Sequence, residues 1–83
     1  MDDQRTSAVI LYRDGTLVLR EVLDPDRRHL LRAGFRPFRL RLTREDGSSS
    51  GGTLWMQDDP SVSDYLNAAR YLFLDEPGSL SWG

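Results

Sequence analysis

The stretch that decides the fold runs from residue 7 to residue 23 and reads SAVILYRDGTLVLREVL. It contains two runs rich in Val, Ile, Leu and Tyr, residues 7–13 and 16–23, with Asp14 and Gly15 between them. Asp-Gly between two such runs is typical of a β-hairpin, because a type I′ turn needs positive φ at both central residues. The sequence therefore predicts an antiparallel hairpin with a two-residue turn.

A two-residue turn also predicts which side chains share a face of the hairpin. Arg13 would pair with Thr16 and Ile10 with Leu19, and cross-strand partners lie on the same face. The face expected in the core carries Ala8, Ile10, Tyr12, Leu17 and Leu19. The opposite face carries Val9, Leu11, Val18, Val22, Arg13, Thr16 and Arg20, which is unusually apolar for a face in contact with water.

Two helices are predicted, each after an Asp-Pro pair. Asp24 and Pro25 favour a short helix that ends at Gly34, because aspartate caps free amides and proline fits the first turn. Asp59-Pro60, followed by Ser61 and Asp64 as a weaker capping pair, precedes the second helix. An apolar stripe with helical spacing marks this second helix: Val62, Tyr65, Leu66, Ala69, Leu72 and Phe73.

Two further strands lie between the predicted helices. Residues 35–44 alternate from Phe38 onward, so that Phe38, Leu40 and Leu42 face the core and Arg39 and Arg41 face outward. In residues 53–57, Leu54 and Met56 would point inward and Trp55 outward. The polar stretch EDGSSSGG, residues 45–52, is expected to be a flexible loop, and residues 75–83 a C-terminal tail.

These elements make a single α+β domain of residues 1–83 with the order ββαββα. We expect two antiparallel hairpins whose sheet is covered on one face by both helices. The other sheet face would then have no helix on it.

The residue types argue against several chemistries. The chain has no cysteine, so thiol nucleophiles and thiolate metal sites are excluded. The single histidine, His29, has no serine or carboxylate at a spacing that suggests a catalytic relay. Helix capping accounts for Asp58 and Asp59 more simply than a metal site does. Residues 47–52 lack the lysine and the following helix of a phosphate-binding loop. We therefore expect a protein that is not an enzyme and has no cofactor or metal.

Charge is distributed unevenly along the chain, although the net charge is only -2. All eleven basic residues are arginine. Residues 24–44 hold seven arginines and two aspartates, whereas residues 45–83 hold Arg70 and seven acidic residues. Any attraction for an anionic partner must therefore come from a local patch.

The predicted helix-free face resembles a protein interface, since Trp, Tyr and Arg are enriched there and monomers rarely expose large apolar patches. The predicted partner-binding residues are Val9, Leu11, Val18, Arg20, Arg39, Arg41, Trp55 and Trp82. We expect a regulatory, adaptor or inhibitor protein, of bacterial or phage type, that binds a protein partner or forms a homodimer. In another interpretation the tail itself covers this face, with Trp82 as its anchor.

The alternative function is nucleic-acid binding through Arg39, Arg41 and Trp55. Two features argue against it: the first helix, with Arg27, Arg28 and Arg32, is expected on the other side of the sheet, and the acidic half repels phosphate. The N-terminal residues show neither a basic leader nor a long apolar segment. This predicts no membrane association and a cytoplasmic location.

Overall fold

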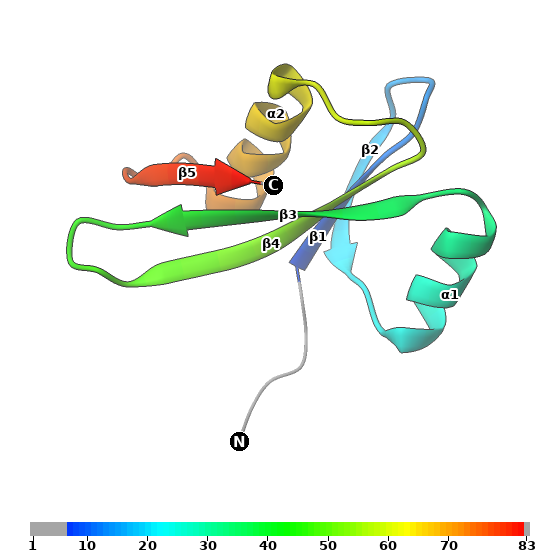
Figure 1. The fold of residues 1–83 in the computed structure, drawn as a ribbon, viewed down its shortest axis with the longest axis horizontal. Helices are drawn as coiled ribbons and strands as arrows, with labels where there is room; N and C mark the ends of the chain where they lie inside the picture. Colours follow the sequence, from blue (N-terminus) through cyan, green and yellow to red (C-terminus); the bar gives the residue numbers. More distant parts are fainter. Residues whose placement is uncertain (1–6, 83) are drawn as a thin grey trace.

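The computed structural model describes residues 7–82 and is α+β, with five strands in one mixed sheet and two helices (Figure 1). The elements are β1 (Ser7–Leu11), β2 (Leu17–Glu21), α1 (Asp24–Arg32), β3 (Arg36–Thr43), β4 (Ser49–Met56), α2 (Val62–Phe73) and β5 (Ser79–Trp82). The strands lie in the order β2-β1-β4-β3-β5. The predicted order ββαββα is confirmed, and a short fifth strand follows it.

The β1–β2 hairpin has a three-residue loop, so the predicted two-residue turn is wrong. The N–H of Tyr12 donates to the carbonyl of Thr16, which leaves Arg13, Asp14 and Gly15 as the loop. The N–H of Gly15 donates back to the Tyr12 carbonyl, and Gly15 has φ 92°. This is the geometry of a type I turn followed by a left-handed residue. The register moves by one residue, and Leu11 pairs with Leu17.

This shift exchanges the two faces of β2 relative to β1. Val9 now lies opposite Leu19, and Ile10 lies opposite Val18. Val9 is fully buried in the core that α2 covers, and Leu11 packs against the same core. The predicted exposed face containing Val9 and Leu11 is therefore wrong, because α2 packs on it. The one-residue change of register brings Leu17 and Leu19 of β2 to this same face.

The two helices cover opposite faces of the sheet, which corrects the prediction that both lie on one face. One hydrophobic cluster joins Val9, Leu40, Leu42 and Leu54 to Tyr65, Ala68 and Phe73 of α2. A separate cluster joins Ala8, Ile10, Val22 and Trp55 to Phe35, and Leu30 of α1 packs against it. Leu54 and Trp55 are neighbours in β4, so their clusters lie on different sides of the strand.

Strand direction explains why the helices separate. β1 is parallel to β4, and both are antiparallel to β2 and β3, while β5 is antiparallel to β3. Consequently β2-α1-β3 and β4-α2-β5 each connect two parallel strands, and both move in the same direction across the sheet. The strands of the two units run in opposite directions. Crossovers of one hand must then place their helices on opposite faces.

The β3–β4 hairpin is longer than predicted. Its pairing continues to Thr43 opposite Ser49, and the turn is closed where the N–H of Arg44 donates to the Ser48 carbonyl. Residues 49–52 of the predicted flexible loop therefore belong to β4. A run of small residues shows no hydrophobic alternation, so the sequence pattern does not indicate a strand there.

The predicted C-terminal tail forms the edge strand β5, which pairs with β3 from Thr43–Ser79 to Leu40–Trp82. The ring of Trp82 stacks on Tyr65 of α2 with centroids 4.8 Å apart. Trp82 thus lies on the α2 side, and the tail does not cover the opposite sheet face. Residue 83 lies outside the described residues.

The helix termini agree with the sequence in part. Ser61 caps α2, and Ser61 and Asp64 exchange side-chain bonds to backbone N–H groups of 2.9 and 3.2 Å, as predicted. In α1 the cap residue is Leu23 rather than Asp24, and Asp26 accepts the Leu23 N–H at 3.2 Å. Neither of the two described helices has the length and apolar character needed to cross a membrane.

Candidate anion-binding groove

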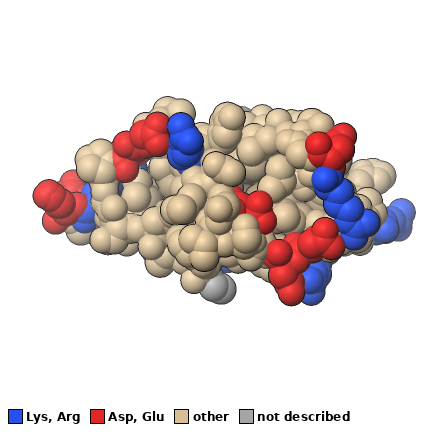
Figure 2. Space-filling model, turned by 90° about the horizontal axis from the view of Figure 1, so that it is seen from above, with Lys and Arg blue, Asp and Glu red and all other residues tan. Residues whose placement is uncertain are grey.

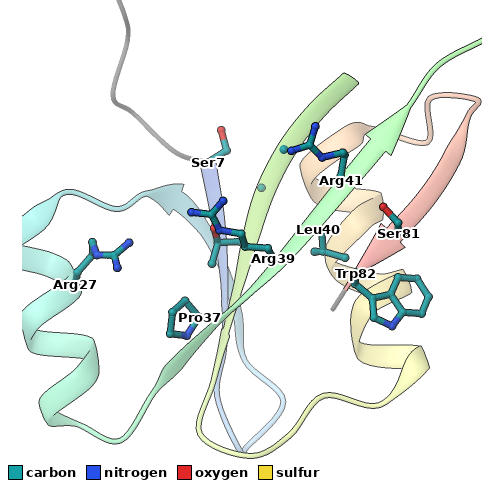
Figure 3. Close-up of a pocket in the computed structure, with 11 residues that line it drawn as sticks. Ser7, Arg27, Pro37, Arg39, Leu40, Arg41, Ser81 and Trp82 are labelled. Carbon is teal, nitrogen blue, oxygen red and sulfur yellow. The ribbon is translucent and has the colours of Figure 1, made fainter. Parts of the chain in front are cut away.

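A concavity of about 740 Å³ lies on the sheet face that carries α1, beside that helix (Figure 3). Its floor includes Gly51 and Thr53 of β4, whose small side chains leave the space open. Arg39 and Arg41 of β3 and Arg27 of α1 line it. We call this concavity the arginine groove.

Strand alternation directs Arg39 and Arg41 into the arginine groove. Leu40, between them, is buried in the α2-side cluster, so its two neighbours must point to the other face. Figure 3 shows both guanidinium groups on the side of β3 away from Leu40 and Trp82. The alternation of this strand, with Phe38 and Leu42 on the core side, is as predicted from the sequence.

Arg27 enters from α1 and is supported by Trp55. The Cζ atom of Arg27 lies 5.7 Å from the Trp55 ring centroid, within range of a cation–π interaction. Trp55 itself is only 1% exposed. Trp55 is therefore on the predicted sheet face but is not open to a partner, because α1 packs on that face.

Ion pairing distinguishes the arginines of the groove from five others. Those five each have a carboxylate partner: Arg13–Asp58, Arg20–Asp26, Arg36–Asp59, Arg44–Glu76 and Arg70–Asp75. Seen from the top of Figure 1, acidic and basic side chains lie beside one another, mostly toward the two ends (Figure 2). Within residues 7–82, Arg27, Arg39 and Arg41 have no carboxylate partner. Arg41 donates only to Ser49 Oγ, at 3.3 Å.

The predicted partner-binding residues do not form one surface. Arg39, Arg41 and Trp82 line the arginine groove, although the Trp82 ring stacks on Tyr65 of α2, and Val9 and Leu11 belong to the α2-side core. Val18, which is 36% exposed, and Arg20 lie on β2 at the edge of the sheet. Arg20 pairs with Asp26 of α1 at 3.3 Å. The apolar centre that was predicted for this interface is absent from the groove.

Sequence reasoning missed Arg27 and the small floor residues Gly51 and Thr53. Arg27 was assigned to a helix on the far side of the sheet, because both helices were placed on one face. The hand of connections between parallel strands places α1 on this face, but that rule can be applied only when the strand order is known. Among the residues that line the groove, none is acidic and none is histidine. Guanidinium and hydroxyl groups can hold an anion by charge-assisted hydrogen bonds.

Shifted pKa values occur in the turns and connecting segments. The Arg44 guanidinium donates to both Glu76 carboxylate oxygens, at 2.9 and 3.0 Å, and lowers the pKa of Glu76. Hydrogen bonds from Ser48 lower the pKa of Asp46, and those from Thr16 lower the pKa of Asp14. No cluster of three or more His, Asp or Glu side chains that could hold a metal occurs in the described part of the chain.

The chain was also compared with known proteins. No family model, no curated protein and no solved structure matches it.

Proposed function

We propose that this protein is a non-enzymatic interaction module that binds an acidic segment of a protein partner in the arginine groove. The observation that carries the proposal is the convergence of three guanidinium groups without carboxylate partners on one concave surface. A regulatory, adaptor or inhibitor role fits such a module. Because the groove is polar, electrostatic complementarity would provide specificity and association rate.

Carboxylates suit this groove for a geometric reason. A guanidinium group can bind a carboxylate through two parallel N–H···O bonds. Arg39 and Arg41 are two residues apart on one strand face, a spacing of about 6.6 Å. An extended acidic segment has a similar repeat between side chains on one face, so alternate carboxylates would meet successive arginines. The hydroxyl of Thr53 on the groove floor can donate further bonds.

Nucleic-acid binding is the second candidate, and one observation favours it. α1 lies on the same sheet face as Arg39 and Arg41, so Arg27 can contact the same anion as they do. The sequence had predicted Arg27 on the opposite face. The burial of Trp55 argues against nucleic-acid binding, since this indole is not open to base stacking, and the ring of Trp82, which also lines the groove, is already stacked on Tyr65. The net charge of -2 also opposes a polyanion.

A fluorescence anisotropy titration separates these functions. The probes are a labelled Glu-rich peptide, single-stranded DNA and single-stranded RNA, each at low and at high salt. Wild type is compared with the double variant Arg39→Gln, Arg41→Gln. The control, Arg13→Gln with Arg70→Gln, removes the same total charge from arginines outside the groove.

We expect wild type to bind the peptide at low salt and the groove double variant to bind it at least about tenfold more weakly. The control should stay within about twofold of wild type, because its arginines already have carboxylate partners. Equal losses in both double variants would refute the groove. Stronger binding of nucleic acid than of peptide, lost only in the groove variant, would establish the second candidate instead.

A further inference from the structure

The outer edge of β2 has backbone groups that no described residue uses. Tyr12 and Thr16 are hydrogen-bonded across the hairpin, and such pairs alternate with non-bonded pairs in an antiparallel ladder. Val18 therefore directs its backbone N–H and C=O toward β1, whereas Leu17 and Leu19 direct theirs away from it. In the described sheet β2 is a terminal strand, so these groups meet no further strand.

The side chains of this edge are apolar and exposed. Val18 is 36% exposed and Leu19 is 49% exposed, and they lie on opposite faces of the strand. Proteins usually protect an edge strand with charge, proline, a bulge or short length. The other edge, β5, is only four residues long and carries two serines. β2 is five residues long and ends in the charged Arg20 and Glu21, but its centre, Leu17-Val18-Leu19, has no charge, proline or bulge.

We propose that two copies of this chain associate through antiparallel pairing of their β2 strands. The two-fold axis would pass midway between the two Val18 residues and be perpendicular to the sheet, because only such an axis continues an antiparallel sheet with its faces preserved. Leu17 of one copy then pairs with Leu19 of the other. Their four outward backbone N–H groups and four carbonyls supply the hydrogen bonds of the new ladder.

This register is the one that the side chains favour. It places Val18 opposite its own copy on one face and the Leu17–Leu19 pairs on the other, so apolar groups meet apolar groups. Centring the axis on Leu19 would instead place Val18 opposite Arg20 and Leu17 opposite Glu21. That second register would also need the Glu21 carbonyl, which already accepts a bond from Arg20 Nε at 3.3 Å.

Mass measurement over a concentration series tests the association. We expect the wild-type mass to rise toward twice 9.5 kDa with concentration, as for a small interface. The Leu19→Lys variant should remain at 9.5 kDa, since its ammonium would be placed against Leu17 of the other copy. The matched control is Leu66→Lys on α2, which is equally exposed at 49% and should behave like wild type.

Cysteine cross-linking tests the register, and it does not depend on the lysine variants folding. The chain contains no cysteine, so each variant has one thiol. Residues facing each other in a non-bonded pair have Cα atoms about 4.5 Å apart, within the range for a disulfide. Val18→Cys should therefore form a covalent dimer under mild oxidation at least tenfold faster than Leu19→Cys, although Leu19 is the more exposed residue.

A wild-type mass of 9.5 kDa at millimolar concentration would overturn the proposal. Equal cross-linking of both cysteine variants would overturn it too, because that result indicates random collision. Loss of the dimer in Leu66→Lys would place the interface on α2 and not on β2. The arginine groove lies at β3 and α1, so each of these outcomes is independent of peptide binding.

Discussion

Gly78 lies at the start of β5, where the chain returns to pair with β3. Its φ is 151°, and a Cβ at this position would be 2.6 Å from the carbonyl oxygen of Thr43 and 3.0 Å from Leu42 Cδ1. Both the backbone conformation and the space therefore require glycine.

We expect Gly78→Ala to lower the free energy of unfolding by about 2–4 kcal/mol, because a strained φ is combined with a clash against backbone. Gly51→Ala is the control. Its nearest neighbour is the Leu40 carbonyl oxygen at 3.8 Å, an ordinary contact, so its effect should stay within about 1 kcal/mol. Urea unfolding monitored by tryptophan fluorescence measures both, and equal effects would contradict the argument.

Gly15 helps to set the length of the loop, and therefore the register, of the β1–β2 hairpin. With φ 92° it takes the left-handed place in a three-residue loop. Asp14 accepts the N–H of Thr16 at 2.9 Å and stabilises that loop. Asp-Gly fits both the two-residue and the three-residue hairpin, so the dipeptide predicted the turn correctly but left its length open. The faces of the hairpin depended on that length.

At the scale of elements, the stack of Trp82 on Tyr65 attaches β5 to α2. The rings are nearly parallel, at 10°, and Trp82 remains 38% exposed. Trp82→Ala removes this aromatic contact, whereas Leu80, the other apolar side chain of β5, still packs against the α2-side core.

We expect Trp82→Ala to lower the free energy of unfolding by about 1–3 kcal/mol, which is the range for burying part of a large side chain. Tyr71→Ala on α2, a residue that is 51% exposed, should change it by less than about 0.5 kcal/mol. Hydrogen exchange at the backbone of β5 should accelerate in the first variant only. Unchanged exchange there would show that backbone pairing and Leu80 hold β5 without the Trp82 stack.

At the scale of the whole molecule, Arg44 connects the β3–β4 turn to the segment between α2 and β5. It donates to both oxygens of Glu76 and to Ser50 Oγ at 2.7 Å. The pKa of Glu76 is lowered in the folded state, so the folded carboxylate binds a proton less readily than the unfolded one. Its contribution to stability is therefore complete above the ordinary glutamate pKa and is lost as pH falls through the lowered value.

Wild type should lose stability as pH falls below about 4.3, where unfolded glutamate takes up its proton. Glu76→Gln should be less stable than wild type at neutral pH, and the difference should shrink as pH falls through the lowered pKa of Glu76. Urea unfolding at several pH values measures this difference. Glu45→Gln is the control, since the Glu45 side chain makes no hydrogen bond or ion pair with another residue of the range 7–82, and it should follow wild type. A difference for Glu76→Gln that stays constant with pH would contradict the pair.

Within the elements, sequence reasoning succeeded where the determinants are local. The capping pair of Ser61 and Asp64, the apolar stripe of α2 and the alternation around Leu40 depend on neighbours within four residues. Residues 49–52 contain only Ser and Gly, and residues 79–82 contain only two apolar side chains, Leu80 and Trp82. Both segments become strands by pairing with β3. In these segments the strand conformation comes from pairing with a neighbouring strand and not from the local sequence.

The sequence by itself determined the α+β class, the order of the first six elements and the two arginines that leave the same side of β3. Only the tertiary structure decided which faces meet. Hairpin register follows from one extra loop residue, and the helix positions follow from the hand of two crossovers whose strands run in opposite directions. Alternation along a strand shows which side chains share a face, but it does not show which of the two sheet faces that is. Strand order and handedness select the face, and they bring Arg27 to Arg39 and Arg41 while Val9 and Trp55 are buried.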